Sequence, residues 1–274
     1  MPPLRVLQVS DLHAGTQEEP EVEGDLRTLV RESDPELVVV SGDLTHRNTP
    51  AQHERAANLL RSLEAPLLVI PGNHDIPRWP PWRFTRTFAE FQRQWRELEP
   101  VYRSERLVVC GLNSVRPWKQ QGGAVRSSQI QRVRDTFANA PGSAFRMVAV
   151  HHHLLGAPWR SAKRTIASRS RLLGSLVDAG AELIVSGHVH QSTVGERREF
   201  EVTVGQVRGT TVATAPGLGQ PRPKRRGEAR GLHLYEIDER STRVLTYAWA
   251  GNHWAQIADR RFPRGLEPLA TVGS

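Results

Sequence analysis

The sequence of 274 residues contains a single cysteine, Cys110, and this scarcity excludes an internal disulfide. The lack of disulfides fits the reducing environment of the cytoplasm. Long apolar runs are missing as well, because the longest, at 37–40 and 67–70, fall far short of the roughly 18 residues that span a bilayer. The apolar run at the N-terminus is too short for the core of a signal peptide. We therefore expect a cytoplasmic protein without a transmembrane segment.

Acidic residues are in the minority, with 29 Asp and Glu against 37 Lys and Arg, which gives a formal net charge of +8. A basic balance attracts partners that carry phosphate. The sequence has only one dense basic block, at 222–226, so nucleic acid is a possible partner but not the favoured one. The hydrophobic fraction of 38% and the charged fraction of 24% fit a globular protein, and we predict one domain over 1–274.

Apolar residues in the first part of the chain alternate between strand-like and helix-like spacing. Buried strands are predicted at 4–9, 36–40, 67–70, 145–150 and 181–185, and helices at 22–33, 51–63, 85–98, 127–137 and 169–179. This alternation is typical of an α/β fold. The segments after position 190 look like short strands, at 202–207, 210–215, 232–237 and 244–248. We expect the region 191–274 to consist mainly of antiparallel strands.

The predicted strands of the first part end in polar residues that are common metal ligands. They are Asp11, His13, Asp43, Asn73, His74, the run His151–His153, His188 and His190. Because the carboxyl ends of parallel strands gather at one edge of a sheet, these side chains should meet there. Carboxylates and imidazoles suit Mn²⁺, Fe and Zn²⁺ ions, and the set is larger than one ion needs. The sequence therefore predicts a site for two ions.

The spacing within two of these motifs supports such a site. In Asp11-Leu12-His13 and in His188-Val189-His190, residues two apart on extended backbone point to the same side. The apolar residue between them would then face the core. Asp43 comes from the central one of the first three strands, and we predict that its carboxylate bridges the two ions.

Two adjacent cations would make the site a catalyst of phosphoester hydrolysis. They lower the pKa of a shared water, so that a metal-bridging hydroxide can attack phosphorus near neutral pH. The leaving alkoxide needs a proton, and His74, which stands beside the ligand Asn73, is the predicted general acid. Asp75 would orient that imidazole or cap the turn.

Five blocks of the sequence resemble, in order and rough spacing, those of calcineurin-like metallophosphoesterases. The blocks are Asp11-Leu-His13, Gly42-Asp43, Gly72-Asn-His-Asp75, the run His151–His153 and Gly187-His-Val-His190. Within the family they most resemble the bacterial class III cyclic-nucleotide phosphodiesterase-like branch. The resemblance implies the metallo-dependent phosphatase fold, an α/β (α+β) fold of four layers with two mixed β-sheets face to face and helices on both sides. Residues 1–190 would supply the ligand blocks, and residues 191–274 would complete the second sheet.

The resemblance also implies how the ligands divide between the ions. One ion would be held by Asp11, His13 and His190, and the other by Asn73, His152 and His188, with Asp43 between them. Many relatives have His-His-Pro in the fourth block, where this sequence has Leu154. Aligning Leu154 with that proline makes His152 the ligand, and His151 stays an alternative. Mn²⁺ and Fe are the expected cofactors, and Zn²⁺, Co²⁺ and Mg²⁺ are possible.

Further residues near these blocks are candidates for binding the substrate. The predicted contacts are Asn73, His74, His153 and Arg78. The loop with Trp79, Trp82 and Arg83 could line the entrance of the site or pack against the flank of the domain. The basic residues Arg160, Lys163 and Arg164 could hold phosphate or lie on a solvated face.

We therefore predict a metal-dependent phosphodiesterase or phosphatase that acts on a small phosphodiester, such as the cyclic nucleotide 3',5'-cAMP, or on a phosphomonoester. A metal-dependent nuclease is an alternative with the same fold. A non-catalytic binding scaffold is an alternative of another class, although scaffolds of this fold typically lack ligands or the histidine at position 74. A homo-oligomer is possible, and the substrate itself depends on loops that one sequence does not decode.

Overall fold

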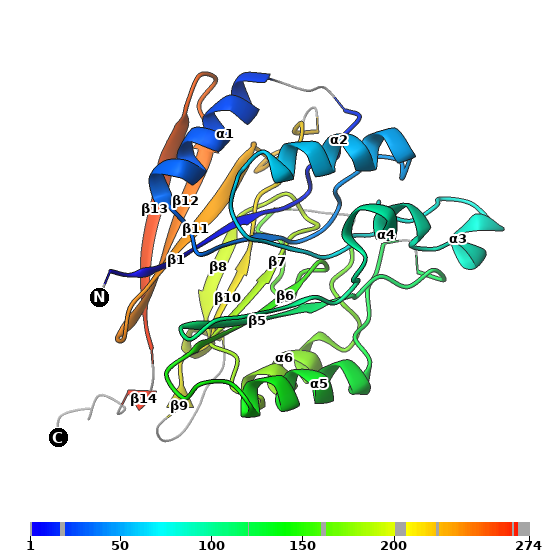
Figure 1. Ribbon diagram of the computed structural model, residues 1–274. Helices are drawn as coiled ribbons and strands as arrows, with labels where there is room; N and C mark the ends of the chain where they lie inside the picture. The colour runs from blue at the N-terminus through cyan, green and yellow to red at the C-terminus, as the bar shows by residue number, and fades with distance from the viewer. Residues whose placement is uncertain are drawn as a thin grey trace.

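The computed structural model describes residues 2–16, 20–119, 121–159, 163–200, 207–222, 225–264 and 266–267. Two six-stranded β-sheets lie face to face, and helices cover their outer faces (Figure 1). These four layers confirm the predicted fold class. Among the described residues, no helix is long and apolar enough to cross a membrane.

The first sheet joins strands from both ends of the chain, in the order β13-β12-β11-β1-β2-β3. Its strands are β1 (Leu4–Val9), β2 (Leu37–Val40), β3 (Leu67–Val69), β11 (Gly231–Ile237), β12 (Ser241–Trp249) and β13 (Trp254–Pro263). β1, β2 and β3 are parallel, whereas β11 pairs antiparallel with β1. The carboxyl ends of the three parallel strands therefore lie at one edge.

The second sheet has the order β4-β5-β6-β7-β10-β8. Its strands are β4 (Val101–Arg103), β5 (Leu107–Leu112), β6 (Phe145–Val150), β7 (Leu183–Ser186), β8 (Thr193–Glu196) and β10 (Thr211–Thr214). The four strands from β5 to β10 in this order are parallel, and the two edge strands run antiparallel to them. Two short strands, β9 (Val207–Arg208) and β14 (Leu266–Glu267), form a separate pair.

Helices cover the outer faces of both sheets. The helices of the described chain are α1 (Pro20–Ser33), α2 (Pro50–Arg61), α3 (Trp82–Thr85), α4 (Ala89–Trp95), α5 (Ser127–Ala138), α6 (Arg169–Asp178) and α7 (Arg197–Phe200). α1 and α2 lie over the first sheet, whereas α5 and α6 lie over the second (Figure 1). The first sheet is thus sandwiched between helices and the second sheet.

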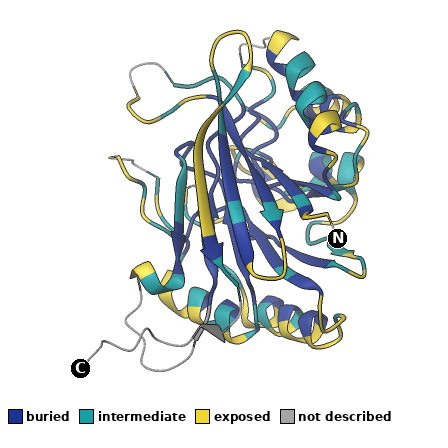
Figure 2. Cartoon of the chain, turned by 90° about the vertical axis from the view of Figure 1, so that its left-hand side faces the viewer, coloured by how far each residue is buried: buried dark blue, intermediate teal, exposed yellow. Residues whose placement is uncertain are grey.

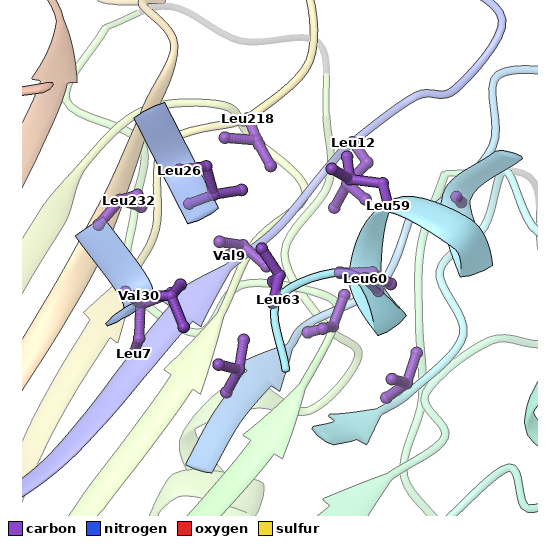
Figure 3. Packing of buried hydrophobic residues seen from close by; sticks show 14 of the residues in the cluster. Leu7, Val9, Leu12, Leu26, Val30, Leu59, Leu60, Leu63, Leu218 and Leu232 are labelled. Carbon is purple, nitrogen blue, oxygen red and sulfur yellow. The ribbon is translucent and has the colours of Figure 1, made fainter. Parts of the chain in front are cut away.

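Side chains that alternate along the central strands fill three apolar layers. Leu7 and Val9 of β1 face outward and pack with Leu26 and Val30 of α1 (Figure 3). Leu4 and Val6 of the same strand face the other sheet and join the layer between the sheets. Most residues of the central strands are buried (Figure 2), as expected for strands covered on both faces.

The C-terminal region differs from the prediction in its sheet assignment. It was expected to complete the second sheet, but β11, β12 and β13 extend the first sheet from β1. Of the strands described after position 190, only β8 and β10 join the second sheet. β13 was not predicted, because most of its residues are exposed (Figure 2) and lack the apolar alternation of a half-buried strand. The segment predicted as a strand at 202–207 lies outside the described residues except for Val207.

The helix predicted at 85–98 is divided into α3 and α4. Arg86 ends α3 with φ −136° and ψ 39°, outside the helical region, and Arg96 ends α4 with a positive φ of 48°. Phe91 in α4 is fully buried, so the predicted apolar face exists over the shorter helix.

Candidate metal centre

The loops that follow β1, β2 and β7 share an unusual backbone conformation. Five of their residues other than glycine have positive φ angles between 49° and 76°, namely Asp11, His13, Asp43, His188 and His190. Residues with side chains enter this region at a cost, and such residues cluster at functional sites. The extended backbone expected at Asp11-Leu12-His13 is therefore wrong. The intervening residues Leu12 and Val189 are nevertheless buried, as predicted, and the polar side chains on either side of them converge.

One group of side chains is formed by Asp11, His13 and His190, the last two from opposite sheets. His190 Nε2 lies 3.1 Å from Asp11 Oδ1, and His13 Nε2 lies 3.8 Å from the same oxygen. The two imidazole nitrogens are 3.0 Å apart. Their ligand atoms all lie within 4.8 Å of one another, which is the spacing that a single ion can bridge.

A second group is formed by Asp43, Asn73, His151 and His188. His151 Nε2 lies 3.3 Å from Asp43 Oδ1 and 3.2 Å from Asn73 Oδ1. Ligand atoms of Asp43, His151 and His188 lie within 4.8 Å of one another. The loops after β2, β3, β6 and β7 thus each contribute one side chain to this group.

Asp43 connects the two groups. Its Oδ1 faces His151, whereas its Oδ2 lies 3.8 Å from His13 Nε2. Burial raises the pKa of this carboxyl, but the charges of His151 and His74 outweigh burial and hold the pKa well below its usual range. The carboxylate is ionised, and its two oxygens address the two groups, as a bridging ligand requires.

Several buried polar atoms of the site have no hydrogen-bond partner. They are Asp11 Oδ1, Asp43 Oδ2, His13 Nδ1, His152 Nε2, His153 Nδ1 and both ring nitrogens of His188. An unpaired buried polar group costs about 1–3 kcal/mol, so such atoms in one place point to a ligand that completes them. Burial lowers the pKa values of His13 and His188 well below the usual range, which keeps both imidazoles neutral. Neutral imidazoles beside ionised carboxylates form a donor set that fits two divalent cations.

The histidine run after β6 places its three rings differently. His151 Nδ1 donates to the Ser41 carbonyl at 2.8 Å, which turns Nε2 toward Asp43 and Asn73. His152 directs Nδ1 to Ser114 Oγ at 2.7 Å, and Gly123 lies against that side of its ring. His153 is buried, with its ring stacked on His188 at a centroid distance of 5.6 Å. The sequence analysis preferred His152 as the ligand, but the geometry favours the alternative, His151.

His74 lies at the open side of the first group. Its ring is edge-on to His13, at a centroid distance of 4.7 Å, and it is only partly buried. Its Nδ1 lies 3.0 Å from the His46 carbonyl, and its backbone N–H donates to Asp43 Oδ1 at 2.8 Å. The backbone carbonyl of the neighbouring loop therefore fixes the ring, as an oriented general acid needs.

Asp75 caps the turns instead of contacting the His74 ring. Its carboxylate accepts hydrogen bonds from the backbone N–H groups of Gly72, Leu44 and Thr45, at 2.8, 3.1 and 2.9 Å. It also accepts from Thr45 Oγ1 at 3.1 Å. Asp75 therefore caps the turn and does not orient the imidazole, and it connects the loop of Asp43 to the loop of His74.

Two further polar residues near the site were not foreseen. His46 forms a group with His13 and His74 whose ring nitrogens lie within 4.8 Å of one another, and it stands three positions after Asp43 in the same loop. That proximity in sequence was the available signal. Glu228 places a carboxylate oxygen 3.9 Å from His190 Nδ1 and is paired with Arg222. No local pattern marks Glu228, because it comes from the loop before β11.

The remaining candidates for substrate contacts are dispersed. Arg78 is exposed, with its guanidinium 5.0 Å from the centre of the Trp79 ring. Arg83 is buried and donates to backbone carbonyls, so it has a structural contact. Burial lowers the pKa of Lys163, and the negative charges of Asp43 and Asp11 oppose that shift. The Lys163 ammonium group therefore lies near the metal centre. Arg164 is exposed, and Arg160 lies outside the described residues.

The comparison with protein families agrees with this geometry. The model described as calcineurin-like phosphoesterase matches residues 4–192. A probable cyclic nucleotide phosphodiesterase of Synechococcus sp. is 26% identical over 71% of this chain and 76% of its own length. The 3',5'-cyclic adenosine monophosphate phosphodiesterase CpdA of Haemophilus influenzae is 23% identical over 73% of this chain and 75% of its own.

Solved structures show the same fold at lower identity. A dimetal phosphatase from Danio rerio is 12% identical and superposes with a TM-score of 0.64 over 97% of this chain and all of its own. That likeness concerns the fold, whereas the family match concerns the blocks that carry the metal centre.

Proposed function

Because the chain belongs to the calcineurin-like phosphoesterase family, a family of metal-dependent hydrolases, we propose that it hydrolyses a small phosphodiester and that a cyclic nucleotide such as 3',5'-cAMP is the leading substrate. The observation that carries the proposal is the Asp43 carboxylate, whose two oxygens face two separate groups of unpartnered metal ligands. Curated relatives that are cyclic nucleotide phosphodiesterases support this substrate class.

We assign Asp11, His13 and His190 to one ion and Asn73, His151 and His188 to the other, with Asp43 shared. His151 replaces the predicted His152, because its Nε2 lies 3.3 Å from Asp43 Oδ1 and 3.2 Å from Asn73 Oδ1 and belongs to the group with Asp43 and His188. Its Nδ1 donates to the Ser41 carbonyl. A hydrogen bond of this kind on the distal nitrogen is typical of histidine ligands. The mixture of imidazole, carboxylate and amide donors suits Mn²⁺ and Fe, as expected from the sequence.

When bound, the two cations supply a hydroxide nucleophile near neutral pH and offset the charge of the phosphoryl group. The protein's own residues then handle the leaving group. With Nδ1–H of His74 donating to the His46 carbonyl, Nε2 is the ring nitrogen that can give a proton to the leaving alkoxide. Asp75 keeps this loop and the Asp43 loop in register through four hydrogen bonds.

The test is hydrolysis of 3',5'-cAMP and of bis(p-nitrophenyl) phosphate by protein loaded with Mn²⁺. Asp43→Ala should abolish hydrolysis of both substrates. His74→Ala should keep the metal but lose roughly 10²–10⁴-fold in kcat on cAMP and much less on the aryl ester, because p-nitrophenolate leaves without a proton. His253→Ala is the matched control, since His253 is an exposed histidine in the turn between β12 and β13.

Two results would contradict the proposal. Activity of metal-loaded Asp43→Ala would remove the shared carboxylate from the mechanism, and equal losses on both substrates would remove the general acid. Single-stranded DNA and glycerophosphodiesters belong in the same screen. A steep decline of activity with salt on DNA, together with inactivity on cAMP, would favour the nuclease instead.

A further inference from the structure

A group of exposed aromatic side chains lies next to the loop that carries His74. Trp79, Trp82, Phe84 and Trp118 are 63%, 55%, 57% and 63% exposed, and we call these residues with Arg78 and Arg86 the aromatic rim. Among the described residues, only Trp159 and Ile257 are other large apolar side chains exposed to a similar degree. Apolar surface gathered in one place marks a contact site for another molecule.

The rim is held in a fixed conformation by a buried arginine. Arg83 donates to the carbonyls of Pro117, Pro77 and Lys119, at 2.6, 2.9 and 3.0 Å. These bonds fasten the segment with Trp118 to the segment with Trp79 and Trp82. Pro80 and Pro81 further restrict the backbone between the two tryptophans. The aromatic rings are thus displayed on a rigid support and are not the ends of a loose loop.

The charged side chains in the rim segment at 77–88 are all basic. No acidic residue occurs between Ile76 and Ala89. Arg78 and Arg86 are exposed, and their guanidinium groups lie 5.0 Å and 5.1 Å from the ring centres of Trp79 and Trp82. Glu97 and Glu99 line a cavity together with Trp118, so the anionic complement applies to the side of the rim with Trp79, Trp82 and Phe84. The chain's net charge of +8 acts in the same direction at longer range.

The rim also projects from the body of the molecule. Figure 1 shows α3, which contains Trp82 and Phe84, at the periphery beside α4, away from both sheets. The segment begins directly after Asp75 and Ile76, at the end of the loop that positions His74. A broad flat partner can reach such a projection without displacing any of the packed layers.

We propose that the aromatic rim docks this protein on the surface of an anionic phospholipid bilayer. Indole rings combine an apolar body with a polar N–H and favour the membrane interface, and basic side chains beside them attract anionic lipids. Phe84 offers only apolar surface, which suits the acyl boundary. A stacking platform for single-stranded nucleic acid is disfavoured, because one face of Trp79 and one face of Trp82 are already covered by arginine.

Vesicle sedimentation tests the proposal with the whole chain. Wild-type protein should sediment with mixed phosphatidylcholine–phosphatidylglycerol vesicles, weakly with pure phosphatidylcholine vesicles, and less as salt rises. A Trp82→Ser and Phe84→Ser double variant should bind the mixed vesicles roughly tenfold more weakly or worse, and Arg86→Glu should lose the preference for phosphatidylglycerol. Ile257→Ser is the matched control, since Ile257 is 63% exposed on β13, and it should bind like wild type.

Unchanged melting temperatures would show that the variants fold. Absence of wild-type sedimentation with the mixed vesicles would overturn the proposal, and so would an equal loss in Ile257→Ser. Binding of a single-stranded oligonucleotide that the double variant loses, without any vesicle binding, would assign the rim to nucleic acid instead. None of these measurements depends on hydrolysis, so they stand apart from the test of the proposed function.

Discussion

Two regions of this molecule bury histidines in contrasting ways. At the metal centre, neither ring nitrogen of His188 has a hydrogen-bond partner. In the first sheet, His233 of β11 is equally buried, but its Nε2 lies 3.0 Å from Ser192 Oγ and its Nδ1 lies 3.1 Å from the Tyr235 hydroxyl. Tyr235 in turn donates to Gln8 Oε1 at 2.6 Å. The ring nitrogens of His233 are satisfied by side chains of the protein, whereas those of His188 need a bound ligand.

The difference teaches how to separate a structural histidine from a ligand. Burial lowers the pKa of both rings, so neutrality alone does not distinguish them. The distinguishing property is the fate of the ring nitrogens. A saturated hydrogen-bond network stabilises the apoprotein, whereas unpartnered nitrogens beside ionised carboxylates stabilise only the metal-loaded protein.

The largest effect should come from the two neighbouring histidines after β6. His151→Ala removes a proposed ligand, so activity should fall by more than the roughly 10–100-fold that an outer partner contributes, and one ion per chain should be lost. His152→Ala should keep both ions and stay within that 10–100-fold range, because His152 contacts the His151 and His188 rings and Ser114. Metal analysis beside kcat distinguishes the two. Loss of an ion from His152→Ala alone would restore His152 as the ligand.

The second prediction tests the contrast between His188 and His233 by the effect of metal on stability. Adding Mn²⁺ at a hundredfold excess over its dissociation constant should stabilise wild-type protein by about 2.7 kcal/mol. His188→Asn should unfold like the wild type in chelator but lose most of this gain. His233→Phe should keep the gain, starting from a free energy of unfolding about 3 kcal/mol lower, because Ser192 and Tyr235 lose a partner. Urea unfolding with and without metal measures both, and identical behaviour of the two variants would refute the distinction.

Much of the centre could be read from the sequence because its ligands stand at the ends of buried strands. Asp11, Asp43 and His188 each follow a short run of apolar residues, and the order of the blocks is a family property. The choice between His151 and His152 could not be read in this way. It depends on Ser41 and Ser114, which belong to other segments and decide which ring turns toward Asp43.

In the fold, too, strands could be predicted from their own residues, whereas pairings between distant segments could not. The parallel strands β1, β2 and β3 follow from their apolar composition. The pairing of β11 with β1 does not, because it joins segments more than two hundred positions apart. Likewise, the exposed strand β13 is held by its partner β12 and not by an apolar pattern of its own.

The smallest effect concerns pH and again uses His233. Burial lowers its pKa from 6.5 to about 3, so the folded protein resists a proton that the unfolded chain accepts. This neutral ring contributes stability that is fully present above pH 6.5 and is lost as the pH falls toward 3. Between pH 6.5 and pH 5 the loss should be about 2 kcal/mol, at 1.36 kcal/mol for each pH unit.

Burial also lowers the pKa values of His13, His152 and His188. At His151 burial is outweighed by the charge of Asp43, which raises the pKa to about 9, so the contribution of His233 is measured as a difference. His233→Gln keeps polar groups for Ser192 and Tyr235 but cannot accept a proton. Both proteins are unfolded by urea in chelator at pH 7 and pH 5, and the wild type should lose about 2 kcal/mol more than the variant. An equal loss would mean that His233 takes up its proton in the folded state, and its saturated hydrogen bonds would then no longer separate it from the histidines of the metal centre.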